Sequence, residues 1–200
     1  EITMFAEYTG SAVYQQTVPH GSHYPSEHMA FMGTLPRLQK PTKNILENYD
    51  LLICVGCDGL RMSVWSDTEP LPSKMPIIHI GINEWEIGKN YSTELAIIGN
   101  VKNTLNDINQ YLKNTLTPEE TLKAKKRLEL IAKNNWNIKK KSLTSKTMHD
   151  KLKKPITPNW LMMNIANNIT KNNIVVEGGL VSTRTLLNYL PYKNNKDFYG

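Results

Sequence analysis

The chain has 200 residues, 40% of them hydrophobic and 21% charged, which is typical of a globular protein with a sizeable core. No apolar run approaches the ~20 residues that a helix needs to cross a bilayer, so we expect no membrane association. The N-terminus lacks the features of a signal peptide, and the chain has two cysteines, Cys54 and Cys57. These features exclude a disulfide framework and favour the cytoplasm.

The net charge of +6 is concentrated in one segment. Residues 113–154 contain 13 basic and 4 acidic residues, so the rest of the chain is slightly acidic. A basic segment can bind nucleic acid, because neutralising phosphates releases counterions. This segment, however, has Trp136 as its one aromatic residue, no glycine and no nucleic-acid-binding motif. We therefore interpret it as a solvated helical pair between two domains and expect no nucleic-acid partner.

The first fifty residues predict a helix, a strand, an ordered loop and a second helix. The first helix covers residues 2–8 and stops at Gly10, and the strand covers 11–16. Residues 19–37 contain three histidines, three prolines and two glycines. Because proline fixes φ and glycine permits unusual backbone, this loop can be ordered without ladder hydrogen bonds. The second helix is expected from Pro41 to Tyr49.

Three short apolar runs follow, at residues 50–56, 76–82 and 95–98. Continuous apolar runs of this length are typical of parallel strands that are covered on both faces. Between and after them, one helical turn is expected at 85–89 and a longer helix at 101–112. This alternation predicts an α/β fold with a doubly wound parallel sheet, in which ligands bind beyond the carboxyl ends of the strands.

The second half of the chain predicts a helical linker and the opening of another α/β unit. Thr117 to Glu120 reads Thr-Pro-Glu-Glu, a capping box with proline at the first helical position, and Thr157-Pro158 starts a helix in the same way. A strand at 173–177 enters a glycine turn, and a helix is expected over 182–189. We therefore predict a first α/β domain that lacks its first strand (1–116), a basic helical linker (117–156) and the incomplete start of a second α/β domain (157–200).

Four segments resemble thiamine diphosphate-dependent enzymes, in the same order along the chain. The loop at 19–37 is similar to the middle-domain loop of the benzoylformate decarboxylase type, and 50–61 to the strand and loop that follow it. Residues 77–90 resemble a middle-domain segment of the acetolactate synthase branch. Residues 175–183 resemble the first strand and turn of the third domain, which binds the cofactor diphosphate. The resemblance implies a Rossmann-like middle domain followed by an incomplete second α/β domain.

The resemblance also implies an activity for the full-length protein. Such enzymes are decarboxylases or carboligases that act on 2-oxo acids with thiamine diphosphate and magnesium, as homodimers or homotetramers. The glutamate that activates the cofactor and the Gly-Asp-Gly motif that holds the metal do not occur in these 200 residues. We therefore expect residues 1–200 alone to bind no thiamine diphosphate and to catalyse no decarboxylation.

Two alternatives concern the middle domain: an acetolactate synthase-like carboligase with bound flavin, and a non-catalytic nucleotide-binding module. Arg61 is similar to an arginine near the flavin of the first group, but relatives without flavin also carry an arginine there. The chain has no Gly-x-Gly-x-x-Gly fingerprint for a dinucleotide. Flavin is therefore not favoured.

The resemblance assigns His28 to the loop histidine that reaches into the active site. Histidine exchanges protons near neutral pH, so we expect His28 to take part in proton transfer. The alternative is a loop histidine that hydrogen-bonds the backbone. We expect His20 and His23 to act as packing or loop-ordering residues.

The glycine turn after the strand at 173–177 is the expected site of the cofactor. Glycine lets the backbone approach an anion closely, and a following helix offers free N–H groups. We expect Gly179, Leu180 and Val181 to meet the cofactor through main-chain groups and Ser182 to cap the helix.

The pair Cys54 and Cys57 has the spacing of half a zinc site. Cys54, however, lies in an apolar strand run, and the chain has no second cysteine pair. A redox role is not favoured either, because thiolate activation favours a helix N-terminus and this pair straddles the end of a strand. We expect no metal at this pair.

Overall fold

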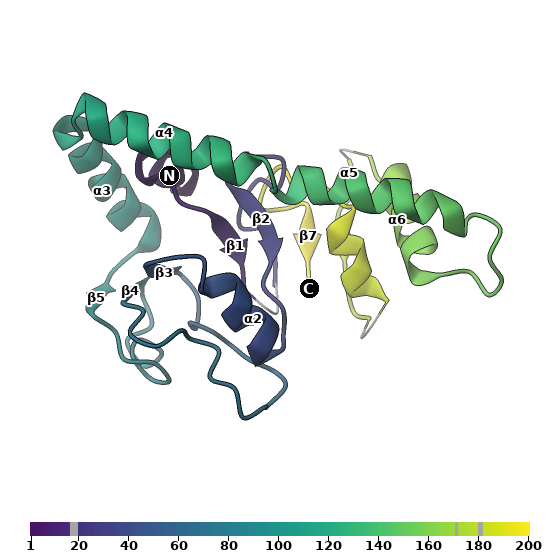
Figure 1. Ribbon diagram of the computed structural model, residues 1–200, viewed down its shortest axis with the longest axis horizontal. Coiled ribbons are helices and arrows are strands. Elements are labelled where there is room, and N and C mark those ends of the chain that lie inside the picture. Colours follow the sequence, from purple (N-terminus) through teal and green to yellow (C-terminus); the bar gives the residue numbers. More distant parts are fainter. Residues whose placement is uncertain (17–19, 171, 180–181) are drawn as a thin grey trace. The chain divides into compact units, whose positions relative to one another are not determined.

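The computed structural model describes residues 1–16, 20–170, 172–179 and 182–200 (Figure 1). The chain divides into two compact units, and the first of them ends at Leu116, where the predicted linker begins. The domain limits proposed from the sequence stay a prediction about the full-length protein. The first unit contains Glu1–Phe5, Gln16–Val18 and Leu35–Leu116, and the second contains Ala6–Gln15, Pro19–Thr34 and Thr117–Gly200.

The first unit contains a parallel sheet of the three predicted apolar runs. Its strands are β3 (Leu52–Val55), β4 (Ile77–Gly81) and β5 (Leu95–Ile98), in that order. In the register, Cys54 lies opposite His79 and Ile80 opposite Ile97. The sheet confirms the α/β class and the parallel strands that the apolar runs predict.

The first unit also contains two whole helices, α2 (Gln39–Leu46) before the sheet in the chain and α3 (Val101–Thr115) after it. Leu105 of α3 is buried, and Asn109 of α3 donates through its side-chain amide to the Glu1 carbonyl, 2.9 Å away. The prediction of a helical turn at residues 85–89 was wrong, because this segment forms turns that do not continue into a helix. Gly88 has φ +72° there, which a right-handed helix cannot continue through.

The second unit begins with the end of α1 (Ile2–Thr9), which stops at Gly10 as predicted, where φ is +64°. Strand β1 (Val13–Gln15) then pairs in parallel with β2 (Phe31–Thr34). The sequence predicted an ordered loop over residues 19–37, and the last part of this loop forms β2. The residues of β2 alternate between buried and partly buried, which is the pattern of a strand with one covered face.

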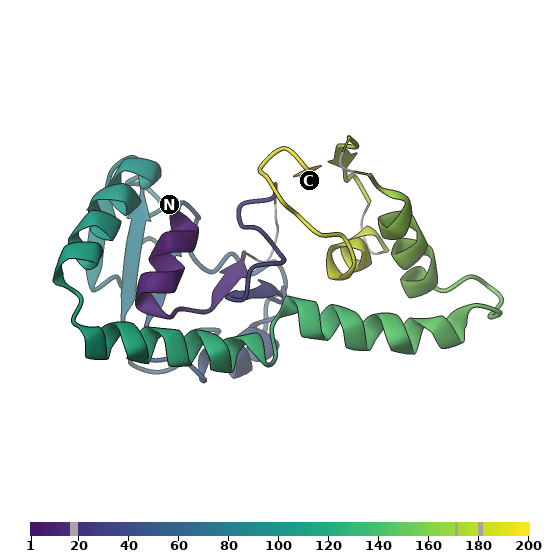
Figure 2. The same cartoon turned by 90° about the horizontal axis from the view of Figure 1, so that it is seen from above.

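The basic segment forms two successive helices, α4 (Pro118–Ala132) and α5 (Trp136–Thr147), followed by a short turn η1 (Met148–Asp150) (Figure 2). The helical pair is confirmed, but it is not wholly solvated. Leu128 of α4 is buried, and Trp136 is buried and donates its indole N–H to the Leu187 carbonyl at 3.1 Å. These helices therefore contribute apolar contacts to the second unit.

The core of the second unit lies at the C-terminal end of the chain. Helix α6 (Pro158–Asn168) starts at Thr157, as predicted, and packs against η2 (Thr183–Asn188). Strand β6 (Val175–Val176) pairs in parallel with β7 (Phe198–Tyr199). The helix predicted at 182–189 is a 3₁₀ helix, η2. The buried cluster consists of Met162, Met163, Ala166, Leu186, Tyr189, Leu190, Tyr192 and Phe198.

The described strands form three parallel sheets of two, three and two strands, and these sheets confirm the predicted α/β fold class. In the described part of the chain, no helix has both the length and the apolar character that a membrane span needs.

We expect Thr117→Ala to lower the free energy of unfolding by about 1 kcal/mol, the usual effect of losing an N-cap. The Thr117 hydroxyl accepts the Glu120 N–H at 3.2 Å, and the Glu120 carboxylate accepts the Thr117 N–H at 2.9 Å. The Thr117 N–H and the Thr117 hydroxyl, which donates to the same carboxylate at 2.7 Å, lower the pKa of Glu120. Because the pKa of Glu120 is lower in the folded than in the unfolded protein, its carboxylate stabilises the folded state fully at pH values above the unfolded pKa. This stabilisation is lost as the pH falls through the folded pKa.

Urea denaturation at neutral and acidic pH measures this effect. The difference between the wild type and Thr117→Ala should shrink at acidic pH. Thr121→Ala, on the same exposed turn but outside the capping box, is the matched control and should stay within about 0.5 kcal/mol of the wild type. A loss from Thr117→Ala that does not change with pH would contradict the role given to Glu120.

Candidate functional site

His28 lies between β1 and β2, and both of its ring nitrogens have partners. Nδ1 accepts the Ala30 N–H at 3.2 Å and lies 2.8 Å from the Tyr24 hydroxyl, while Nε2 lies 3.1 Å from the Glu7 carboxylate. Because Nδ1 accepts a backbone N–H, the ring proton of the neutral imidazole is on Nε2 and points to Glu7. The side chain of His28 is 17% exposed and that of Glu7 54%. His28 therefore holds an exchangeable proton at a partly open position.

Aromatic contacts fix the orientation of this imidazole. Tyr24 is buried, meets the His28 ring edge-on at 5.4 Å between centroids, and stacks on Phe31 at 5.9 Å. Burial, with a smaller contribution from Glu7, raises the pKa of Tyr24, so its hydroxyl stays protonated and can donate to His28. The contact with Ala30 orders the loop, and the contact with Glu7 orients the proton.

His20 and His23 are exposed. His20 has its Nδ1 3.4 Å from the Gly200 carbonyl, and its own carbonyl accepts the Gly200 N–H at 3.4 Å. Desolvation by the surrounding loop, and then the neighbouring His20, lower the pKa of His23 although its side chain still reaches solvent. The backbone contacts of His20 suit the loop-ordering role expected for it.

The predicted cofactor turn follows β6 directly. Gly178 and Gly179 are exposed, and a Cβ added at Gly178 would meet no atom within 4 Å. Leu180 and Val181 lie outside the described residues. Ser182 stands at the N-cap position of η2, but its side chain makes no capping hydrogen bond, contrary to the expected cap. The open backbone of Gly178 and Gly179 is the feature of this turn that suits close approach of an anion.

Strand β7 brings the histidine-rich loop and the cofactor turn together within the second unit. Tyr199 pairs with Val176, and its carbonyl accepts the Glu177 N–H at 2.8 Å. Tyr199 also forms an antiparallel bridge with Gly21. The histidine-rich loop, through Gly21, and the strand before the glycine turn, through Val176, therefore both pair with Tyr199. The His28 side chain contacts Glu7, Tyr24 and Ala30.

The loop is also tied to the residues before β7. The Ser26 hydroxyl accepts the Tyr192 N–H at 2.7 Å, and the Ser22 hydroxyl donates to the Asn194 carbonyl at 2.5 Å. Ser22 and Ser26 are both buried. No sequence motif marks these two serines, because their partners are backbone groups more than 160 residues further along the chain.

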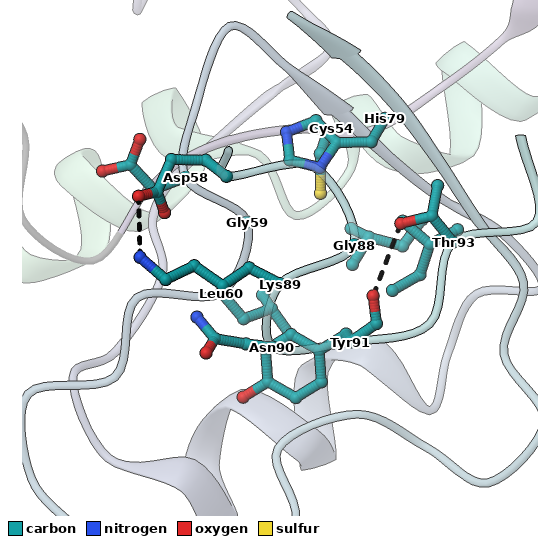
Figure 3. Close-up of a pocket in the computed structure, with 13 residues that line it drawn as sticks. Cys54, Asp58, Gly59, Leu60, His79, Gly88, Lys89, Asn90, Tyr91 and Thr93 are labelled. Carbon is teal, nitrogen blue, oxygen red and sulfur yellow. Dashed lines mark hydrogen bonds and ion pairs between the residues drawn. The ribbon is translucent and has the colours of Figure 1, made fainter. Parts of the chain in front are cut away.

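A small pocket lies in the first unit along one face of β3 and β4, beside the loops that follow these two strands (Figure 3). Its lining begins at Leu52 and Ile77, the first residues of these strands, so the pocket is not confined to the carboxyl ends where ligands of parallel α/β sheets are expected. Lys89 at the pocket pairs with Glu86 at 3.0 Å, so its charge is already neutralised. Arg61 pairs with Asp58 at 3.3 Å and is not among the lining residues. The lining residues include Cys54, Asp58, Gly59, Leu60, His79, Gly88, Lys89, Asn90, Tyr91 and Thr93.

Cys54 and Cys57 belong to the first unit, whereas His20, His23 and His28 belong to the second. Within residues 1–16, 20–170, 172–179 and 182–200, no group of three or more His, Cys, Asp or Glu side chains is placed to hold a metal ion. Both cysteines are free thiols, with Cys54 buried and Cys57 partly exposed.

Parallel sheets whose strands alternate with helices along the chain define an α/β protein. Residues 1–108 match the family model for the thiamine pyrophosphate enzyme, central domain. The chain belongs to this family of thiamine pyrophosphate enzymes, as the sequence motifs indicated.

Two curated relatives are acetolactate synthase large subunits. The chain is 29% identical over 189 residues to the probable acetolactate synthase large subunit of Methanocaldococcus jannaschii, covering 88% of this chain and 29% of that protein. It is 32% identical over 107 residues to the acetolactate synthase large subunit of Corynebacterium glutamicum, covering 52% of this chain and 17% of that protein. The chain therefore spans less than a third of the length of these relatives.

Solved structures of similar fold include two decarboxylases. The benzoylformate decarboxylase of Polynucleobacter necessarius matches with a TM-score of 0.73 and 15% identity, over 98% of this chain and 33% of that one. The thiamine diphosphate-dependent 4-hydroxybenzoylformate decarboxylase of Rhodococcus jostii matches with a TM-score of 0.67 and 17% identity, over 98% and 33%. At these identities the match shows a shared fold.

Proposed function

We propose that the full-length protein is a thiamine diphosphate-dependent decarboxylase or carboligase that acts on 2-oxo acids, most similar in its loop to the benzoylformate decarboxylase type. The observation that carries the proposal is the junction at Tyr199, where the histidine-rich loop and the glycine turn after β6 adjoin one strand. A loop that offers a proton and a turn that accepts an anion are what this chemistry requires of the protein.

The turn after β6 fits the diphosphate of the cofactor. Gly178 has open space where a Cβ would stand, and Gly179 is exposed beside it. Since η2 is a short 3₁₀ helix, we assign the contacts to main-chain groups of residues 179–181 rather than to a helix dipole. Bound there, thiamine diphosphate would supply the carbon centre that stabilises the negative charge left by decarboxylation. No cluster in the described part of this chain suits the magnesium ion.

His28 is the residue of this chain that we propose for proton transfer. It holds its proton on Nε2, oriented by the Glu7 carboxylate, and Tyr24 and Ala30 fix the ring from the other side. The partly exposed edge of the ring is the side from which a proton can be exchanged.

Release of carbon dioxide from a panel of 2-oxo acids by the full-length protein, with thiamine diphosphate and magnesium, tests the proposal. Product analysis with an added acceptor separates decarboxylation from carboligation. Absence of cofactor-dependent turnover on every 2-oxo acid would overturn it. Co-purified flavin would instead favour the acetolactate synthase-like alternative. We further propose a cytoplasmic homodimer or homotetramer, which sedimentation of the full-length protein tests.

Gly179→Val is expected to weaken thiamine diphosphate binding by the full-length enzyme at least about tenfold, or about 1.4 kcal/mol, because a branched side chain would block main-chain approach to the diphosphate. Leu180→Ala is the control and should change the Kd less than about threefold, since it leaves main-chain groups in place. Calorimetric titration with cofactor and magnesium measures both constants. The opposite ranking would show that the cofactor turn lies elsewhere.

A further inference from the structure

Cys54 and Cys57 flank a tight turn at the end of β3, next to the pocket. Gly56 adopts φ +60°, a left-handed conformation that lets the chain reverse between the two cysteines. The Gly56 N–H donates to the Ile80 carbonyl at 2.8 Å, and the His79 Nε2–H donates to the Cys57 carbonyl at 2.8 Å. Both sides of the turn are therefore anchored to β4, which holds the two cysteines at a fixed separation.

The two thiols have different environments. Cys54 is 5% exposed and lies opposite His79 in the register of β3 and β4, where Figure 3 shows both side chains at the pocket. Cys57 is partly exposed on the turn. One thiol is thus accessible to a reagent, and the other is placed beside it under cover of the sheet.

The two side chains also interact with each other. A hydrogen bond from the Cys54 thiol lowers the pKa of Cys57 to about 7, although burial opposes the shift. The same contact, with burial, raises the pKa of Cys54. Asp58 raises the pKa of Cys57, and backbone hydrogen bonds with Gly59 and Val55 lower it. A partner thiol thus supplies the stabilisation that a helix N-terminus gives elsewhere.

We propose that Cys54 and Cys57 form a reversible thiol–disulfide site, in which Cys57 is the attacking thiol, Cys54 the resolving thiol and a small-molecule disulfide the oxidant. Three observations support this assignment. The turn between the cysteines is anchored to β4, one thiol is buried while the other is partly exposed, and Cys54 lines the pocket. Because Cys54 lines the pocket, the disulfide would form in the pocket wall and change the surface that the pocket presents.

The reaction takes two exchange steps. The Cys57 thiolate attacks one sulfur of the small disulfide, a mixed disulfide forms on Cys57, and one small thiolate leaves. Cys54 then loses its proton to this thiolate and attacks the Cys57 sulfur, which releases the second small thiolate with uptake of a proton from solvent. Two protein thiols are oxidised, one small disulfide is reduced to two thiols, and a reducing thiol reverses the sequence.

Intact mass spectrometry of the 200-residue chain with oxidised glutathione at pH 7 tests the proposal. We expect the wild type to lose two hydrogens, with peptide mapping to one Cys54–Cys57 disulfide that dithiothreitol reverses. Cys54→Ala should instead accumulate a stable mixed disulfide with glutathione on Cys57. Cys57→Ala should stay unmodified, because Cys54 is buried.

Alkylation of Cys57 by iodoacetamide at pH 7 gives a second readout that needs no disulfide. The contact with Cys54 lowers the pKa of Cys57 and so raises its thiolate fraction at pH 7, and the accompanying loss of nucleophilicity offsets only part of this gain. The wild type should therefore react faster than Cys54→Ala. Circular dichroism confirms that each variant is folded.

Two results would overturn the proposal. One is a wild type that accumulates the mixed disulfide as stably as Cys54→Ala does, since Cys54 then does not resolve it. The other is a Cys57→Ala variant that reacts as fast as the wild type. Neither result depends on the enzymatic activity proposed above.

Discussion

His28→Ala in the full-length enzyme is expected to slow turnover by a factor of about 10² to 10⁴, the usual range for a lost acid or base, without loss of thiamine diphosphate. The imidazole holds its proton on Nε2 against Glu7, and alanine removes both the proton and the ring. Steady-state turnover, with calorimetric titration of the cofactor, measures the two effects separately.

Two further variants separate proton transfer from loop ordering. His28→Asn places an amide oxygen near the position of Nδ1, where it can accept the Ala30 N–H that now lies 3.2 Å from Nδ1, but it cannot transfer a proton. It should be as slow as His28→Ala. His20→Ala, from the same loop, should change turnover less than about tenfold. Recovery of turnover in His28→Asn would assign His28 to the ordering of the loop.

Gly10→Ala is expected to cause the largest loss of stability among single glycine substitutions in the second unit, about 2–6 kcal/mol. Gly10 has φ +64°, and a Cβ there would lie 2.6 Å from the Ala124 carbonyl oxygen and 2.8 Å from the Ala124 Cα. The cost combines a strained backbone, about 1–3 kcal/mol, with overpacking against a helix, about 1–3 kcal/mol. Urea denaturation followed by circular dichroism measures it.

Two glycines of the same unit are matched controls. Gly33 has φ +106°, but a Cβ added there would meet only the Trp136 Cδ1, at a van der Waals distance of 3.6 Å. Gly33→Ala should therefore lower the free energy of unfolding through backbone strain alone. Gly178 is not among the positive-φ glycines and has open space, so Gly178→Ala should stay within about 0.5 kcal/mol of the wild type. Equal losses for Gly10→Ala and Gly33→Ala would contradict the predicted clash with Ala124.

Local signals in the sequence predicted much of the fold. The apolar runs became β3, β4 and β5, because a parallel strand covered on both faces needs continuous apolar residues. Thr117 and Thr157 marked the starts of α4 and α6, because a cap is made by residues within one turn of each other. Motif order along the chain was sufficient to indicate the family.

Contacts between distant residues decided the rest. Strand β2 formed inside a loop because β1 offered it a parallel partner, and η2 formed where an α-helix was predicted. The junction of Gly21 with Tyr199 joins positions 178 residues apart, for which no periodicity in the sequence provides a signal.

The sequence by itself determined the α/β class, most element positions and the candidates His28 and Gly179, since these depend on residue type and short spacing. Only the tertiary structure decided which tautomer His28 adopts, which segments adjoin the turn after β6, and that Cys54 and Cys57 interact as unequal thiols. The physical reason is that proton position and thiol reactivity depend on the donors that surround a side chain, and folding brings those donors from elsewhere in the chain.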